Sequence, residues 1–213
     1  MKKLIEAPCY LDPETVIEAY RALQNAQAGS ETAKHRHIAA QYIKPGMNGV
    51  DCGSSGDPVV PWAIQVELPL DEYRAYNTVR PADQSIHWRG SALDLPFFAG
   101  TLDFVHSAHL LEDFEDWGPA LKEWHRVLKP NGYLLIAVPD HKRFRAHVKR
   151  HKDEHGLDVD NLSHKSEHLV RRGAIKEWFL DNMASQKYET VYDDFVNDDP
   201  CEYSLLWVAR RLF

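Results

Sequence analysis

The sequence has few of the features that mark secreted, membrane-spanning or metal-clustered proteins. Its 213 residues include only three cysteines, which lie far apart and form no CxxC pair. They therefore predict neither a disulfide framework nor a zinc knuckle, and they favour a reducing compartment. No run of 18 apolar residues occurs, and Glu6 interrupts the first apolar residues. We therefore expect no transmembrane helix, no secretory signal and a cytoplasmic location.

An excess of positive charge is also missing. The chain has 25 Lys and Arg residues against 32 Asp and Glu residues, which gives a formal net charge of −7. This balance argues against a general affinity for nucleic-acid phosphates or anionic membranes. Hydrophobic residues make up 44% of the chain, enough for the core of one domain. We expect a single domain over residues 1–213, with helices in the N-terminal part, residues 1–45.

Apolar residues at helical spacing predict four helices outside the basic segment discussed below. Asp12 and Pro13 can start the first helix, Ser30 can cap the second, and Asp116 can cap the third. The second should stop at the Lys44-Pro45-Gly46 turn, and the third at the turn around Pro130. The expected helices cover about residues 13–27, 31–43, 117–128 and 169–184, with Leu180 on the apolar side of the last.

Short apolar runs bounded by Gly, Pro or acidic residues predict strands at residues 49–52, 63–68, 102–108 and 133–138. Such runs are typical of strands buried on both faces of a parallel sheet. Two further strands, at residues 188–195 and 203–212, are joined by a turn short enough for an antiparallel hairpin. The alternation of strands and helices indicates a mostly parallel α/β sheet.

The segment "DCGSSG", residues 51–56, follows the first expected strand. Gly53 and Gly56 permit positive φ and a close approach of the backbone to a ligand, and Ser54 and Ser55 add hydroxyl donors. Two glycines at this spacing are also common in plain turns. Glu67 ends the next strand, where a carboxylate can accept both hydroxyls of a ribose or simply face water.

Residues 87–140 carry a more specific pattern, with "SALDLPF" at 91–97, "SAHLLED" at 107–113 and "RVLKPNG" at 126–132. This stretch resembles the class I S-adenosylmethionine-dependent methyltransferases, the type 11-like branch. The resemblance implies a Rossmann-like, mostly parallel seven-stranded sheet with a C-terminal antiparallel strand. It also implies S-adenosyl-L-methionine as the cofactor and a small-molecule or glycan-like methyl acceptor.

By this resemblance, the residues that contact the cofactor fall into three groups. The bend after the first strand would hold the methionine part, Glu67 the ribose, and the segment after the third strand the adenine. The expected cofactor-binding residues are Asp51, Gly53, Ser54, Ser55, Glu67, Ser91, Ala92 and Ser107.

Methyl transfer from a sulfonium needs mainly an in-line nucleophile at about 3–3.5 Å, and no metal is required. A base would help a hydroxyl or protonated amine acceptor. His109, after the fourth of the parallel strands, is the first candidate, followed by Asp140 and His141 at the end of the next strand. His109 is also compatible with simple packing at a strand end, and His106 should point to the opposite side of its strand.

Three departures from the family pattern leave a second interpretation open. Ser55 replaces a glycine, so its backbone must avoid positive φ or bear strain, and Ser91 replaces an acid. Residues 57–62 hold two prolines and are too few for an ordinary crossover helix, so we expect a shortened one. The alternative function is a catalytically degenerate binding or scaffold subunit. A dehydrogenase is disfavoured because GxGxxG is missing.

Residues 141–168 form a basic segment that holds six of the 12 histidines. A solvated basic helix is one interpretation. A metal site built from His147, His151 and His155 is another, although no carboxylate or cysteine spacing supports it. The third is a lid at the active-site mouth, where the resemblance places this insertion. In that case Arg143 and Arg145 would bind an anionic acceptor.

Overall fold

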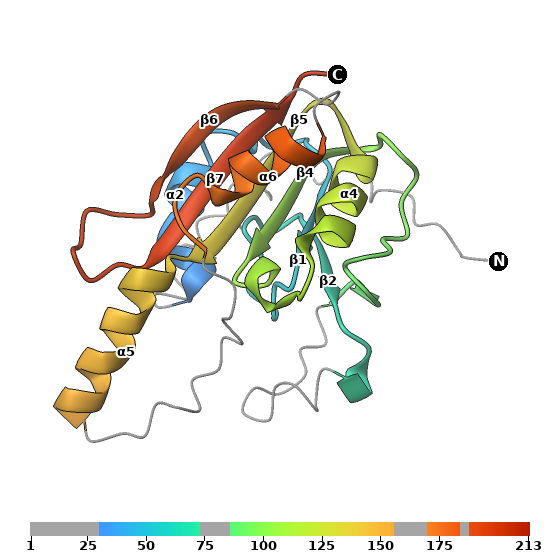
Figure 1. Ribbon diagram of the computed structural model, residues 1–213. Helices are drawn as coiled ribbons and strands as arrows, with labels where there is room; N and C mark the ends of the chain where they lie inside the picture. Colours follow the sequence, from blue (N-terminus) through green and yellow to red (C-terminus); the bar gives the residue numbers. More distant parts are fainter. Residues whose placement is uncertain (1–29, 73–85, 156–169, 184–187) are drawn as a thin grey trace.

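The computed structural model describes residues 30–72, 86–155, 170–183 and 188–213, without the side chains of residues 151–155. The helix expected at 13–27 and residues 156–168 of the basic segment lie outside this part. The described chain forms one seven-stranded sheet in the order β3-β2-β1-β4-β5-β7-β6, with helices on both faces (Figure 1). The strands are β1 (Gly49–Cys52), β2 (Ile64–Glu67), β3 (Trp88–Arg89), β4 (Leu102–Ala108), β5 (Leu128–Pro139), β6 (Tyr188–Phe195) and β7 (Ser204–Arg211).

The first five strands run parallel, and β7 is antiparallel to both of its neighbours. The expectation of a Rossmann-like, mostly parallel sheet with a C-terminal antiparallel strand is therefore confirmed. The carboxyl ends of the parallel strands lie at the lower edge in Figure 1, where α5 begins. The helices are α2 (Glu31–Ala39), the 3₁₀ turn η1 (Leu111–Asp113), α4 (Trp117–Val127), α5 (His141–His155) and α6 (Ala174–Asn182).

Helices α4 and α6 cover one face of the sheet (Figure 1). Helix α4 starts where Asp116 accepts a hydrogen bond from the Gly118 amide, as the sequence predicts. Its Trp124 is fully buried in the larger core, and the indole Nε1 donates to the carbonyl of Ala92 at 3.0 Å. This bond ties the segment after β3 to the helix that follows β4.

Helix α2 and the short connection between β1 and β2 cover the opposite face of the sheet. Residues 53–63, all of which the structure describes, form turns and no helix, so the crossover is reduced even further than the shortened helix expected. Ile38 and Ala39 of α2 instead pack with Val59 and Val60 of the connection and with Phe104 of β4. A helix that precedes β1 in the chain therefore shields the surface that a crossover helix ordinarily covers.

Three sequence-based details are corrected by the structure. Leu128 belongs to β5 rather than to the preceding helix, with extended backbone at ψ 135°, and Pro130 disfavours helical backbone at the next residue, Lys129. Helix α2 ends at Ala39, and residues 40–42 continue as turns. Helix α6 is shorter than expected, since it starts after Gly173 at φ 84°, and its Leu180 is exposed instead of packing in the core.

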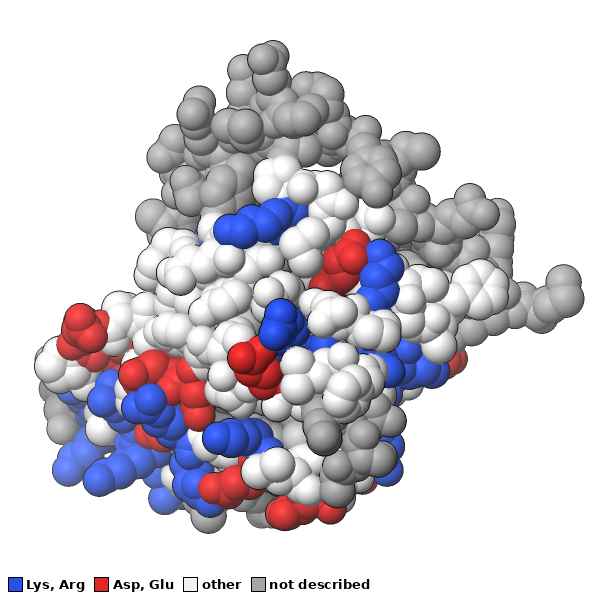
Figure 2. All heavy atoms as spheres, turned by 90° about the horizontal axis from the view of Figure 1, so that it is seen from above, with Lys and Arg blue, Asp and Glu red and all other residues white. Residues whose placement is uncertain are grey.

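Charges of both signs lie beside one another on the edge formed by the amino ends of the parallel strands. Figure 2 looks onto this edge and shows acidic and basic side chains interspersed with uncharged surface. An even mixture of this kind produces no strong field of one sign. The strand-end residues singled out by the sequence lie at the opposite, carboxyl edge of the strands.

Candidate functional site

The bend after β1 is a tight loop with three left-handed positions within four residues. Gly53 has φ 75°, Ser55 has φ 49° and Gly56 has φ 82°. Ser55 therefore does not avoid positive φ but bears it, at a typical cost of about 1–3 kcal/mol for a residue other than glycine. A Cβ added at Gly53 would lie 3.1 Å from Cδ2 of Leu110, a tight contact that the leucine side chain would have to relieve by a small shift.

Glu67 ends β2 with its carboxyl group turned toward this bend. Its Oε1 accepts the Ser55 amide at 2.8 Å, and the residue is only 7% exposed. Burial raises the pKa of the Glu67 carboxyl, and the amides of Ser55 and Leu68 partly offset that rise. Strand β2 and the bend therefore converge on one point at the carboxyl edge of the sheet, as the sequence predicts.

Asp51 and Ser54 use their side chains within the protein. Asp51 accepts the Val59 amide at 2.7 Å with one oxygen and contacts Nδ1 of His106 at 2.8 Å with the other. The Ser54 hydroxyl donates to Oε1 of Gln65 at 3.0 Å. These side-chain contacts hold the bend in shape. A ligand could therefore bond only the backbone groups of Asp51 and Ser54 or the lone pairs that their side chains do not already use.

The other expected cofactor-binding residues lie on neighbouring strand ends. Ser91 follows β3, is exposed, and accepts the Leu93 amide at 3.1 Å, while Ala92 is buried against α4. Ser107 on β4 is fully buried beside Cys52, and its hydroxyl has no hydrogen-bond partner among the described residues. An unpaired buried hydroxyl at this position is a polar group that a ligand can satisfy.

His109 lies just beyond β4 in the left-handed region, with φ 51°. Its Nε2 is 3.1 Å from the Ser204 hydroxyl and 3.4 Å from Oε2 of Glu31. Glu31 also accepts the Tyr203 hydroxyl at 2.8 Å and the Ser204 hydroxyl at 2.6 Å. We call these four residues, Glu31, His109, Tyr203 and Ser204, the His109 cluster.

The electrostatics of the His109 cluster favour an ionised Glu31. Burial raises the pKa of this carboxyl, but His109, the Ser204 hydroxyl and Lys34 outweigh it and lower the pKa to about 2. The Lys34 ammonium lies 2.9 Å from Glu31 Oε2 and 4.8 Å from the centre of the Tyr203 ring. An anionic carboxylate beside an imidazole can orient the ring and stabilise its protonated form.

Sequence reasoning missed the partners of His109, because Glu31 is 172 positions from Tyr203 and 173 from Ser204 along the chain. Acidic residues are common in the first turn of a helix because they interact favourably with the helix dipole. The position of Glu31 in the sequence therefore did not indicate a functional role. His106 meets Nε2 of the buried His35 of α2 at 2.8 Å, and His109 contacts Glu31 of the same helix, so the expectation that His106 points to the opposite side is wrong.

The two candidate residues after β5 have different environments. Asp140 caps α5, since its Oδ1 accepts the Arg143 amide at 2.9 Å. The Nδ1 atom of His141 is buried without a hydrogen-bond partner in the described part of the chain. The structure therefore gives Asp140 a capping role and leaves Nδ1 of His141 without a partner among the described residues.

The side chains of Arg143 and Arg145 in the basic segment lie in different environments. The Arg143 guanidinium stacks over the Phe195 ring, 3.4 Å from its centre, and donates to the carbonyl of Glu202 at 3.1 Å. Arg145 is exposed. Arg143 also lines an open groove of about 660 Å³, together with His37, Ile38, Gln41, Tyr192, Asp194, Phe195, Val196, Asn197, Asp198 and Pro200.

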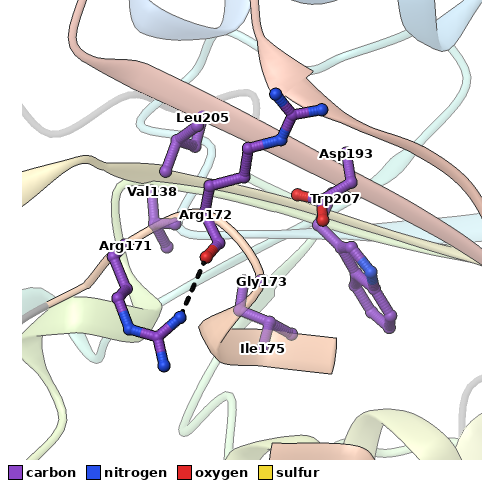
Figure 3. A pocket seen from close by; sticks show the side chains of 8 residues that line it. All are labelled: Val138, Arg171, Arg172, Gly173, Ile175, Asp193, Leu205 and Trp207. Atoms are coloured by element: carbon purple, nitrogen blue, oxygen red, sulfur yellow. Dashed lines mark hydrogen bonds between the residues drawn. The ribbon is translucent and has the colours of Figure 1, made fainter. Parts of the chain in front are cut away.

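A second hollow, beneath the start of α6, is too small for a ligand. It measures about 10 Å³, the space of roughly one water. In Figure 3 the Arg171 guanidinium turns back to the carbonyl of Arg172, a contact of 3.3 Å. Its lining residues are Val138, Arg171, Arg172, Gly173, Ile175, Asp193, Leu205 and Trp207.

Within the described ranges, no group of three or more His, Cys, Asp or Glu side chains is arranged to hold a metal ion. Across the same residues, none of the helices combines the length and the apolar character needed to cross a bilayer.

Comparisons with known proteins find methyltransferases among the similar chains. Residues 69–136 match the family model described as a methyltransferase domain. The chain is 28% identical over 122 residues to a demethylmenaquinone methyltransferase of Lysinibacillus sphaericus, covering 50% of this chain and 48% of the relative. It is 33% identical over 127 residues to the uncharacterized protein YafE of Escherichia coli, covering 57% of this chain and 54% of the relative. The chain thus spans about half the length of these relatives.

Solved structures show the same fold. A chain from the complex between the Haloferax volcanii Trm112 methyltransferase activator and a methyltransferase superposes with a TM-score of 0.57 at 19% identity, covering 92% of this chain and 96% of that chain. At this identity the likeness shows the architecture alone. Residues 69–136 of the chain thus resemble a methyltransferase domain, and the sheet of the described residues has the architecture of a solved methyltransferase complex.

Proposed function

We propose that this chain is a cytoplasmic enzyme that transfers a methyl group from S-adenosyl-L-methionine to a small-molecule or glycan-like acceptor. The observation that supports this proposal most strongly is the convergence of Glu67 and the strained bend, with Glu67 Oε1 2.8 Å from the Ser55 amide. The class I methyltransferases that the chain resembles use S-adenosylmethionine as the methyl donor.

The strand-end residues fit an adenosyl ligand. Glu67 offers further lone pairs beyond those used by the Ser55 and Leu68 amides, as needed to accept two ribose hydroxyls. Gly53, Ser54 and Ser55 would hold the methionine part, Ser91 and Ala92 would border the adenine, and the unpaired Ser107 hydroxyl would gain a partner. Asp51 would keep the bend in place. When bound, the cofactor supplies an activated methyl group with a neutral thioether as leaving group.

The His109 cluster would serve the acceptor. His109 would take the proton of an acceptor hydroxyl or ammonium, and the Glu31 carboxylate would stabilise the imidazolium that forms. Its left-handed backbone is the kind of strain found at functional sites. His141, with its free Nδ1, is the second candidate for the base. Asp140 would act through the start of α5 rather than on the proton.

A thermal-shift titration with S-adenosylhomocysteine tests the proposal. Ligand at about 100 times its Kd should add about 2.7 kcal/mol to the free energy of unfolding. A saturable shift, followed by methyl transfer from labelled S-adenosylmethionine to a member of an acceptor panel, would support the enzyme. No shift at millimolar ligand, with a cooperative unfolding transition showing that the protein is folded, would contradict the proposal.

Replacing His109 with asparagine should lower kcat by about 10²- to 10⁴-fold, because a positioned base typically contributes that much. Asparagine tolerates the left-handed backbone, so the loop should keep its shape. The Kd for S-adenosylhomocysteine should stay within twofold of wild type. Steady-state kinetics with the acceptor found in the panel would measure this, and an unchanged kcat would reassign the proton to His141.

The basic segment yields a separate prediction. If Arg143 and Arg145 bind an anionic acceptor, Arg143→Ala and Arg145→Ala should each raise the acceptor KM while leaving cofactor affinity alone. Arg143 lines the groove beside α2, so its change should be the larger. Lys142→Ala is the matched control, because Lys142 is an exposed neighbour on the same helix. Unchanged acceptor kinetics in both arginine variants would reject the role.

A degenerate binding or scaffold subunit is the second candidate. It is favoured by Ser55, Ser91 and the connection at residues 53–63, where a crossover helix and its amino terminus are replaced by turns. This candidate predicts binding of S-adenosylhomocysteine, or none, and no methyl transfer to any acceptor of the panel. Turnover by wild type that is lost in His109→Asn would exclude it.

A further inference from the structure

Helix α2 holds the end of the bend directly. Asp57 follows Gly56, and each of its carboxylate oxygens meets a side chain of α2 or its cap. Oδ1 accepts Nη2 of Arg36, and Oδ2 accepts the hydroxyl of Ser30. Arg36 also donates from Nε and Nη2 to the carbonyl of Pro58, at 3.3 and 3.2 Å. Arg36 is 3% exposed and Asp57 is 6% exposed, so the contact is shielded from solvent.

A second buried connection joins the same helix to the start of the bend. His35 of α2 meets His106 at 2.8 Å, and His106 meets Asp51 at 2.8 Å. Asp51 in turn accepts the Val59 amide. Both ends of the segment from Asp51 to Val59 are therefore connected to α2 through buried polar side chains.

The bend needs such support more than an ordinary one does. Ser55 is held in a left-handed conformation that a serine adopts only when its surroundings impose it. A crossover helix would ordinarily continue from the bend and fix its last residues, but here residues 57–62 form turns. Only Ile38 and Ala39 among the residues of α2 are buried and apolar, while Thr32, His35 and Arg36 are buried and polar. The docking of α2 is thus specified by the same contacts that hold the bend.

We propose that Arg36 is a positioning residue for the cofactor. Through Asp57 and the Pro58 carbonyl, it fixes the bend in the conformation that binds S-adenosylmethionine, although Arg36 itself touches no cofactor. Helix α2 therefore replaces the missing crossover helix in function as well as in packing. By linkage, cofactor binding must strengthen the docking of α2. This inference rests on the proposed function.

The test compares the affinity of arginine variants for S-adenosylhomocysteine by isothermal titration calorimetry. Arg36→Met should raise the Kd by about 5- to 100-fold, the usual range for coupling between separate sites. Arg36→Lys keeps the positive charge but loses the fork that reaches Asp57 and Pro58 together, so its Kd should lie between those of wild type and Arg36→Met. Arg210→Met is the matched control, because Arg210 pairs with the exposed Glu189 at 2.7 Å, on the β6–β7 edge of the sheet.

Two further measurements separate positioning from a loss of folding. The double variant Arg36→Met/Asp57→Asn removes both charges, so it leaves no unpaired carboxylate in the interior. It should therefore fold even if the single variant Arg36→Met does not. Hydrogen exchange of the α2 amides should slow when S-adenosylhomocysteine binds wild type, and this protection should be smaller in the double variant. Circular dichroism and a cooperative melt establish that each variant is folded.

The outcomes distinguish this inference from the proposed function. If wild type binds S-adenosylhomocysteine while the folded double variant binds it within twofold of wild type, the positioning role is wrong and the function stands. If wild type does not bind it at all, both fail. A raised Kd in the Arg36 variants, with unchanged affinity in Arg210→Met and ligand-dependent protection of α2, supports the role.

Discussion

Replacing Glu67 with glutamine is expected to remove nearly all stabilisation of the protein by S-adenosylhomocysteine. The change deletes the charge that would accept two ribose hydroxyls, and two charge-assisted hydrogen bonds contribute about 3 kcal/mol together. The Kd should therefore rise about 100-fold. At a ligand concentration that stabilises wild type by about 2.7 kcal/mol, the variant should gain less than about 0.5 kcal/mol.

The matched control for this experiment is Glu189→Gln. Glu189 is a strand residue like Glu67, but it forms an exposed ion pair with Arg210, and such pairs contribute little to stability. Its ligand-induced shift should equal that of wild type. A Glu67→Gln protein that is stabilised as strongly as wild type would show that the ribose contact lies elsewhere.

Lowering the pH is expected to destabilise the protein through His35. This residue is fully buried, and burial, His106 and His109 lower its pKa well below the ordinary 6.5. The unfolded chain then binds a proton more readily than the folded chain. Stability from neutral His35 is therefore complete above about pH 6.5 and is lost as the pH falls toward the lowered pKa.

Urea unfolding at pH 7.5 and pH 5.5 measures the effect. Each pH unit below 6.5 should cost up to about 1.4 kcal/mol from this one group. Wild type should therefore lose about 1.4 kcal/mol more than His35→Gln over this interval. His37→Gln, an exposed histidine on the same helix, should keep the wild-type dependence. Equal pH dependence in wild type and His35→Gln would contradict a buried neutral His35.

The sequence predicts the elements of this fold well where the signal is local. The strands at 49–52, 102–108 and 188–195 match their expected bounds, because each is a short run between turn residues. Ser30 and Asp116 cap their helices as expected, since a cap depends only on the next few residues. The reduced first crossover was also predictable from the prolines in residues 57–62.

The sequence does not reveal which helix takes the place of the missing crossover. That arrangement depends on Arg36 meeting Asp57 and on Ile38 packing with Val59, contacts between segments that the chain brings together only when the sheet forms. The partners of His109 were missed for the same reason. Their roles follow from tertiary geometry, and no spacing rule places Glu31 beside the start of β7.

The candidate site contains one residue whose position the sequence predicts and one whose side-chain partners it does not. Glu67 was predictable, because an acid at the end of β2 must lie near the end of β1 in a parallel sheet. Asp51 was predicted as a cofactor contact, and the structure shows that its two side-chain oxygens meet His106 and the Val59 amide. A sequence shows that a polar residue ends a strand, but not which neighbours satisfy its oxygens.

A crystal structure of the protein with S-adenosylhomocysteine would test the central proposal most directly. We expect the ribose hydroxyls within hydrogen-bond distance of Glu67, the backbone of residues 53–55 against the amino-acid part of the ligand, and the sulfur facing the His109 cluster. A ligand bound in the groove beside α2, or a Glu67 carboxylate that makes no ribose contact, would contradict it.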